Sequence, residues 1–148
     1  YLIEYNVRMG DPECQVILPR LKTDLATILY NTANNNLSKT IINWRKDKSM
    51  TIVLCSKGYP GNYKKNINIK NIDKIKLSKR DQIYHAGTIL KNGKLMSNGG
   101  RILNVTSIGK NFFDIRERII RIINNIKFKN GFFRKDIGWR VVNKNENN

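Results

Sequence analysis

Apolar positions recur at helical spacing in two parts of the chain. In the first, Pro19 interrupts the pattern and predicts a short helix followed by a longer one that ends at Asn34. The second predicts an amphipathic helix over Asn111–Asn125 that turns one isoleucine-rich stripe inward. The apolar residues that define the two patterns are Val16, Ile17, Leu21, Leu25, Ile28 and Leu29, then Phe112, Ile115, Ile119, Ile122, Ile123 and Ile126.

Strand patterns and turn residues occupy most of the remaining chain. Tyr1–Val7 alternates, and Met50–Cys55 is typical of a buried strand. Asn-Gly and Gly-Gly pairs indicate tight turns between the later strands, because these residues tolerate positive φ. The other expected elements are strands over Gln82–Leu90, Lys94–Ser97 and Arg101–Ile108, a polar connector over Leu37–Lys48, and a terminal strand or loop over Phe132–Val142. This order predicts an α+β fold with an antiparallel sheet of about four strands, packed by the Asn111–Asn125 helix.

The high positive charge of the chain has two possible explanations, nucleic-acid binding and a biased composition. The chain of 148 residues carries a net charge of +17, which is typical of nucleic-acid-binding proteins. However, 18 Lys, 21 Asn and 21 Ile together indicate a compositional bias, since all three have AT-rich codons. The lysines are spread along the chain and form no stripe with interleaved aromatics. We therefore favour a solvated basic surface and keep a basic nucleic-acid-binding module as the alternative.

The cysteine and histidine positions argue against a zinc site, and the hydropathy argues against a transmembrane helix. Cys14 and Cys55 are far apart, and neither lies at a zinc-ligand spacing from His85, the one histidine. We expect both thiols to be reduced, as in a cytoplasmic protein, and His85 to be structural. No apolar run approaches the length of about 18 residues that a transmembrane helix needs, and no signal peptide is visible, so we expect no membrane partner.

The spacing Glu4-x-Asn6-x-Arg8 indicates a candidate site for a metal ion and a phosphate group. On a strand these residues share one face, in steps of about 6.6 Å. Glu4 and Asn6 offer oxygen ligands of the kind that Mg²⁺ takes, and Arg8 could hold an anionic oxygen of the same metal-bound group. The spacing alone is equally typical of an exposed strand with a Glu–Arg pair, which stabilises little.

The residues around and after this spacing resemble one known enzyme family over most of the chain. Residues 4–15 resemble the metal-binding strand and loop of phosphoribosylamine–glycine ligase, an ATP-grasp enzyme of purine biosynthesis. Further stretches are similar to that family in the same order, and the resemblance spans residues 1–142. These stretches are Leu21-Lys22-Thr23-Asp24-Leu25, residues 56–63, His85-Ala86-Gly87-Thr88, residues 98–106 and residues 134–140.

The resemblance implies a reaction and a set of site residues. The family uses ATP to activate glycine as an acyl phosphate, which the amine of 5-phosphoribosylamine attacks. Glu4 and Asn6 match the family's Mg²⁺ or Mn²⁺ ligands, and Arg8 matches a catalytic arginine beside the phosphates. Arg101 follows the Asn98-Gly99-Gly100 turn, and its position, by analogy with ATP-grasp enzymes, makes it a candidate ligand for the ribose 5-phosphate.

The resemblance also predicts the division of the chain. Residues 1–49 would end the ATP-grasp core with its last strand and helices, residues 50–142 would form a small C-terminal domain, and residues 143–148 a disordered tail. The adenine and glycine pockets would lie upstream of Tyr1. We therefore expect a C-terminal piece of the ligase that is inactive by itself.

Overall fold

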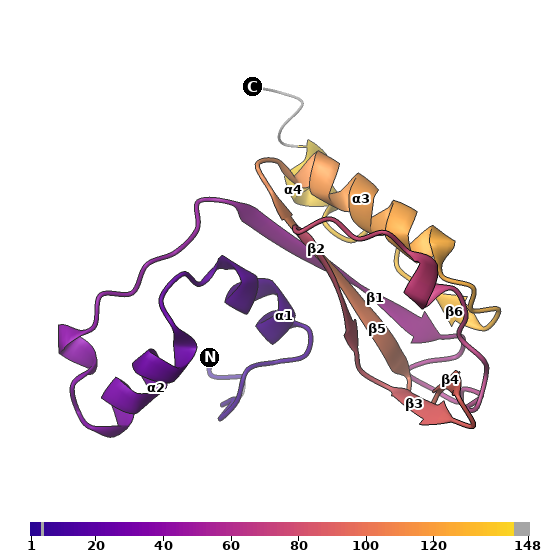
Figure 1. Cartoon of the computed structure of the whole chain (residues 1–148), viewed down its shortest axis with the longest axis horizontal. Coiled ribbons are helices and arrows are strands. Elements are labelled where there is room, and N and C mark those ends of the chain that lie inside the picture. Colours follow the sequence, from indigo (N-terminus) through magenta and orange to yellow (C-terminus); the bar gives the residue numbers. More distant parts are fainter. Residues whose placement is uncertain (4, 144–148) are drawn as a thin grey trace.

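The computed structural model describes residues 1–3 and 5–143 (Figure 1). Four α-helices, three short 3-10 helices and six strands form among them. In chain order they are α1 Glu13–Ile17, η1 Leu18–Arg20, α2 Leu25–Ala33, η2 Leu37–Lys39, β1 Lys48–Ser56, η3 Ile72–Lys74, β2 Asp81–His85, β3 Thr88–Lys91, β4 Lys94–Ser97, β5 Arg101–Gly109, α3 Phe112–Asn125, β6 Gly131–Phe132 and α4 Trp139–Asn143.

A four-stranded antiparallel sheet in the order β2-β5-β1-β6 forms the centre of the molecule. The two long strands β1 and β5 pair from Lys48↔Gly109 to Leu54↔Leu103, where an irregularity shifts the register and places Cys55 opposite Arg101. The α+β class and the antiparallel sheet of four strands are therefore confirmed.

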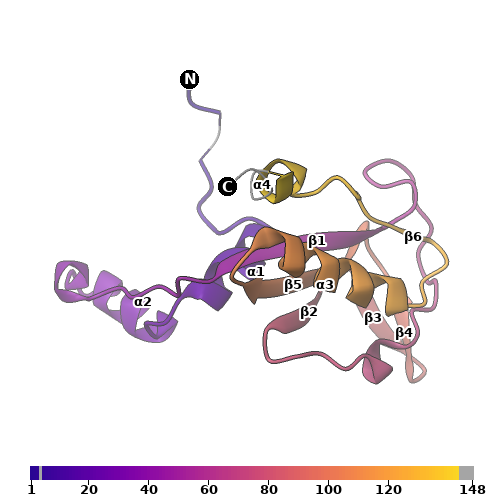
Figure 2. The ribbon, with the colours of Figure 1, turned by 90° about the horizontal axis from the view of Figure 1, so that it is seen from above.

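The two faces of this sheet differ in chemistry. Helix α3 lies along one face, and Figure 2 shows it running beside β1 and β5. Its isoleucine stripe is buried as predicted, at 0–7% exposure, and each such side chain stabilises the fold by roughly 1.5–3 kcal/mol. The buried apolar residues of this core are Met50, Ile52, Leu54, Leu103, Val105, Ile115, Ile119, Ile122 and Ile123, among others.

The opposite face of the sheet is polar. Side chains alternate along β5, so Asn104 and Thr106 point away from the α3 core. Both are buried, and the Thr106 hydroxyl donates to Thr51 Oγ1 at 2.8 Å. Helix α1 and the loop before it cover this face, on the side away from α3 (Figure 1). Asn104 connects this face to the N-terminal part of the chain, because its Nδ2 donates to Asp11 Oδ1 at 2.9 Å.

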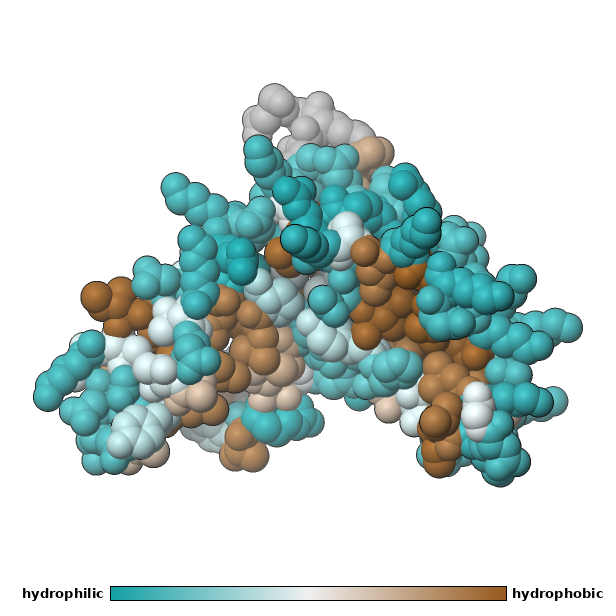
Figure 3. All heavy atoms as spheres, in the orientation of Figure 1, coloured by the Kyte–Doolittle hydropathy of each residue, from teal (hydrophilic) through white to brown (hydrophobic). Residues whose placement is uncertain are grey.

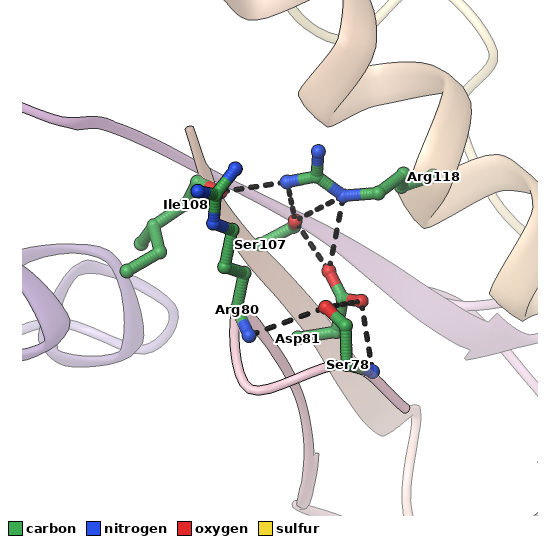
Figure 4. Close-up of polar contacts among 6 residues, drawn as sticks. All are labelled: Ser78, Arg80, Asp81, Ser107, Ile108 and Arg118. Atoms are coloured by element: carbon green, nitrogen blue, oxygen red, sulfur yellow. Dashed lines mark hydrogen bonds and ion pairs between the residues drawn. The ribbon is translucent and has the colours of Figure 1, made fainter. Parts of the chain in front are cut away.

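An ion pair fastens α3 to the β2 edge of the sheet (Figure 4). The buried Asp81 carboxylate accepts hydrogen bonds from the Ser107 hydroxyl at 2.6 Å and from Arg118 Nε at 3.3 Å. Its other oxygen accepts from the Ser78 hydroxyl at 2.5 Å, and Arg118 Nη2 donates to the Ile108 carbonyl at 2.6 Å. Burial raises the pKa of Asp81, but the bonds from Ser107 and Ser78 and the Arg118 charge outweigh it and hold the pKa below its usual value.

The single strand expected over residues 82–90 is two strands in two sheets. Strand β2 ends at His85, and β3 begins at Thr88 and pairs with β4 in a separate hairpin. The break lies at Gly87, whose backbone passes so close to Gly99 that a Cβ on it would lie 2.6 Å from the Gly99 Cα. The hairpin turn is as predicted, because Asn92 and Gly93 both have positive φ, at 50° and 70°.

The N-terminal expectations are only partly confirmed. Pro19 does end α1, and α2 begins after Asp24, whose carboxylate accepts from the Thr27 amide at 2.8 Å. The strand expected over residues 1–7 is wrong for the described residues, because residues 1–3 and 5–7 adopt no strand conformation and are largely exposed. The sequence Asp11-Pro12-Glu13 predicts a helix start with Asp11 as its N-cap, but the N-cap position of α1 is Pro12.

The C-terminal segment differs from the expected strand or loop. Only β6 pairs with the sheet, and residues 139–143 form α4 instead. Of the tail predicted over residues 143–148, Asn143 ends this helix, and residues 144–148 lie outside the described residues. No helix in the described ranges has both the length and the apolar character needed to cross a membrane.

Candidate functional site

The predicted metal and phosphate residues lie in the segment before α1. Glu4 lies outside the described residues, so its role stays a prediction. Asn6 and Arg8 lie in exposed, irregular chain, and Arg8 Nη1 donates to the Met9 carbonyl at 3.2 Å. Within residues 1–3 and 5–143, no three His, Cys, Asp or Glu side chains gather closely enough to hold a metal ion.

Asp11 joins this segment to the polar face of the sheet. Its main-chain carbonyl accepts from Arg101 Nη1 at 2.5 Å, and its Oδ2 lies 3.5 Å from Arg101 Nε. Its Oδ1 accepts from Asn104 Nδ2 at 2.9 Å and from Gln15 Nε2 at 3.0 Å. Sequence reasoning missed this role, since Asp-Pro-Glu is equally typical of a helix start and no local pattern points to partners some 90 residues away.

The backbone around Arg101 is fixed on several sides. Arg101 begins β5 directly after the Gly99-Gly100 turn. The Ser56 amide donates to the Gly100 carbonyl at 2.7 Å, and the Ser56 hydroxyl donates to the Gly99 carbonyl at 3.1 Å. The Arg101 carbonyl accepts from the Gly87 amide at 2.8 Å. The turn is therefore a packed structural element, and the prediction of a plain turn explains its glycines without a phosphate ligand.

Gly100 is required because the ring of Tyr59 lies against it. A Cβ at position 100 would lie 2.0 Å from a carbon of that ring, so the ring must move. We expect Gly100→Ala to lower the free energy of unfolding by about 1–3 kcal/mol, the usual range for overpacking. Thermal or urea denaturation of the 148-residue chain measures this difference.

The clash with the ring can be tested in a second background. In a Tyr59→Ala chain, which lacks the ring, Gly100→Ala should change the free energy of unfolding by less than about 0.5 kcal/mol. An equal loss in both backgrounds would show that the backbone of the turn, and not Tyr59, requires glycine.

A pocket of about 320 Å³ opens beside Arg101. It combines two guanidinium groups with aromatic and aliphatic walls, which suits a ligand that carries a phosphate or carboxylate. Arg134 is oriented by Asp136, whose carboxylate accepts from Arg134 Nη2 at 2.6 Å. The lining residues are Ile52, Val53, Cys55, Tyr59, Pro60, Arg101, Phe132, Phe133, Arg134 and Ile137.

Cys55 is a buried thiol, and His85 contacts a neighbouring hydroxyl. Burial raises the pKa of the Cys55 thiol, and the Asp11 charge adds to this while Arg101 opposes it, so Cys55 is a protonated thiol at neutral pH. Both cysteines are free. His85 Nδ1 lies 2.9 Å from the Thr88 hydroxyl, which agrees with the structural role expected for it.

Comparison with known proteins gives one consistent family. The family model described as "Phosphoribosylglycinamide synthetase, C domain" matches residues 49–140. The chain is 50% identical over 141 residues to the phosphoribosylamine–glycine ligase of Agrobacterium fabrum, covering 95% of this chain and 33% of that protein. It is 44% identical to the chloroplastic phosphoribosylamine–glycine ligase of Arabidopsis thaliana, covering 95% and 27% of the two chains.

A solved structure agrees with these sequence relatives. The crystal structure of phosphoribosylamine–glycine ligase from Thermotoga maritima superposes with a TM-score of 0.70 at 28% identity, over 92% of this chain and 33% of that one. The chain thus spans about a third of the length of the curated bacterial relatives.

Proposed function

This chain belongs to the family of phosphoribosylglycinamide synthetase C domains, and on that premise we propose that it is the C-terminal part of an ATP-dependent phosphoribosylamine–glycine ligase. The observation that supports this most directly is 50% identity over 95% of the chain to a protein of that name. The alternative suggested by charge alone, a nucleic-acid-binding module, has no such support. The ligase would work in the cytoplasm, where the two free thiols stay reduced.

The proposed reaction forms one amide bond and consumes one ATP. A glycine carboxylate oxygen attacks the γ-phosphorus of ATP, which releases ADP and leaves glycyl phosphate. The amine of 5-phosphoribosylamine then attacks the carbonyl carbon, and inorganic phosphate leaves as the C–N bond forms. The amine loses one proton, and the product is glycinamide ribonucleotide.

The residues before α1 would act on the phosphates of ATP. Glu4 and Asn6 supply a carboxylate and an amide oxygen, a donor set that fits Mg²⁺ or Mn²⁺. A bound divalent ion supplies charge neutralisation for the transferring phosphoryl group. Arg8 adds a guanidinium that would hold a phosphate oxygen as negative charge shifts during transfer.

The pocket beside Arg101 would receive the phosphorylated amine. Arg101 and Arg134 provide the cationic groups, and apolar and aromatic side chains form the walls beside them. We assign Arg101 to the 5-phosphate of that substrate. This assignment agrees with its position as the first residue of β5, next to a rigid turn.

We propose that residues 1–49 complete the ATP-grasp core and that residues 50–142 are the C-terminal domain. Helices α1 and α2 and the 3-10 helices η1 and η2 have no buried residue. Large apolar side chains there are exposed, among them Leu29 at 59%, Tyr30 at 70% and Ile41 at 78%. Figure 3 shows hydrophobic residues at the surface of this part of the molecule. Surface of this kind is typical of an interface with the rest of a larger protein.

The chain alone should not bind ATP tightly. Asn6 and Arg8 lie in exposed chain, and no further wall for an adenine ring accompanies them among the described residues. Calorimetric titration of the 148-residue chain with Mg-ATP should show no saturable binding below about 1 mM. The reading frame extended upstream should instead release ADP in the presence of glycine and 5-phosphoribosylamine.

These two measurements separate the outcomes. Low-micromolar ATP binding by the 148-residue chain would contradict the assignment of the nucleotide site to the upstream part. An extended protein that folds but releases no ADP with both substrates would contradict the proposed reaction.

A further inference from the structure

Asp11 is the one carboxylate that contacts Arg101 among the described residues. Its main-chain carbonyl and its Oδ2 meet the Nη1 and Nε atoms of Arg101, at 2.5 Å and 3.5 Å. Its Oδ1 is held by the amides of Asn104 and Gln15, at 2.9 Å and 3.0 Å. The carboxylate is therefore oriented from two sides before it meets the guanidinium.

The remaining nitrogen of Arg101 is available to a ligand. Within the described part of the chain, no atom accepts a hydrogen bond from Nη2 of Arg101, and the residue lines the 320 Å³ pocket. Asp11 itself does not line that pocket. The pairing thus uses the Nε and Nη1 atoms of the guanidinium and leaves Nη2 free for an oxyanion in the pocket.

Stability alone does not explain this arrangement well. The Asp11 and Arg101 side chains are 39% and 42% exposed, and ion pairs exposed to this extent contribute about 0–1 kcal/mol. The pair does restrict a long side chain that otherwise carries about 2 kcal/mol of rotamer entropy. An arginine ordered in advance loses less entropy when it binds its ligand.

We propose that Asp11 is a positioning residue of the ligase, which orients Arg101 toward the phosphate monoester of the amine substrate. The inference rests on the proposed function and adds to it a residue that touches neither substrate nor metal. Asp11 follows Arg8 by three positions, so the same contacts connect the ATP-phosphate segment to β5, which carries the candidate substrate arginine.

The test is Asp11→Asn in the extended ligase. Asparagine keeps the size of the side chain, but it removes the charge that faces Arg101 Nε. The KM for 5-phosphoribosylamine should rise about tenfold, while the KM values for ATP and glycine stay within twofold. The melting temperature of the 148-residue chain carrying Asp11→Asn should fall by no more than a few degrees, as for loss of an exposed pair.

Two further variants distinguish positioning from simple destabilisation. Asp24→Ala is the control, because the Asp24 carboxylate caps α2 through Thr27 and has no contact with Arg101 among the described residues. It should lower stability by about 0.5–2 kcal/mol without changing any KM. In an Arg101→Met ligase, whose KM for 5-phosphoribosylamine should already be raised at least tenfold, Asp11→Asn should add less than twofold.

The outcomes that overturn the inference differ from those that overturn the proposed function. Equal rises in all three KM values, or effects of Asp11→Asn and Arg101→Met that multiply in the double variant, would refute positioning through Arg101. An unchanged KM in an active Asp11→Asn ligase would refute it as well. An unmutated extended protein that makes no glycinamide ribonucleotide would refute the proposed function instead.

Discussion

Arg118→Ala is expected to lower the free energy of unfolding by about 3 kcal/mol, because it leaves the buried Asp81 carboxylate without its cation. The Asp81 side chain is 6% exposed and that of Arg118 is 27% exposed, which favours the lower end of the range for broken buried pairs. The same substitution removes the bond from Arg118 to the Ile108 carbonyl. Urea denaturation of the 148-residue chain at pH 7 provides the measurement.

The pH dependence gives an independent check on this ion pair. The folded-state pKa of Asp81 is below its unfolded value of about 3.9, so its stabilisation is present above about pH 4 and is lost as the pH falls through the folded pKa. The unmutated chain should lose stability below pH 4 more steeply than Asp81→Asn does. Joint replacement, Asp81→Asn with Arg118→Met, should cost less than the sum of the single variants. A change below about 0.5 kcal/mol for Arg118→Ala would show that water replaces the guanidinium.

Loss of the proposed metal ligands should have the largest effect on activity. In the extended ligase, Glu4→Gln replaces a carboxylate by a neutral amide and Asn6→Ala removes the amide oxygen. We expect each to lower kcat roughly 100-fold, equivalent to about 2.7 kcal/mol of barrier. Both variants should also need more Mg²⁺ for half-maximal rate. Arg8→Lys should lose activity without this shift, because an ammonium cannot reproduce the two-point contact of a guanidinium.

The control for these variants is Asp73→Asn, which removes one negative charge from the exposed η3 helix. It should leave both kcat and the Mg²⁺ requirement unchanged. Normal rates at limiting Mg²⁺ in Glu4→Gln and Asn6→Ala would show that these two residues do not hold the ion.

Residues whose role depends on local pattern were predictable from sequence. The isoleucine stripe of α3 and the Asn92-Gly93 turn follow from periodicity and backbone preference, and both form as expected. The division between β2 and β3 was not predictable, because it depends on the close approach of Gly87 to Gly99 in a different strand connection. Asp11 was misassigned for the same reason, since its partners on β5 are distant in sequence.

The expected strand over residues 1–7 illustrates a different limit. Alternating side chains indicate that a segment can form a strand, but hydrogen bonds from a neighbouring segment decide whether it does. Residues 1–3 and 5–7 are not in strand conformation. The alternating pattern therefore shows that this segment can form a strand, but residues 1–3 and 5–7 do not form one in this structure.

The polar face of the sheet has a mechanical consequence. The loop and helix that cover it are held in part by hydrogen bonds to Asn104 and Arg101, and water can replace each of these contacts as the two surfaces separate. The apolar core beneath α3 would stay closed during such a separation, since it lies on the other face of β1 and β5. A sub-global opening between residues 10–20 and the sheet would therefore leave the rest of the domain folded.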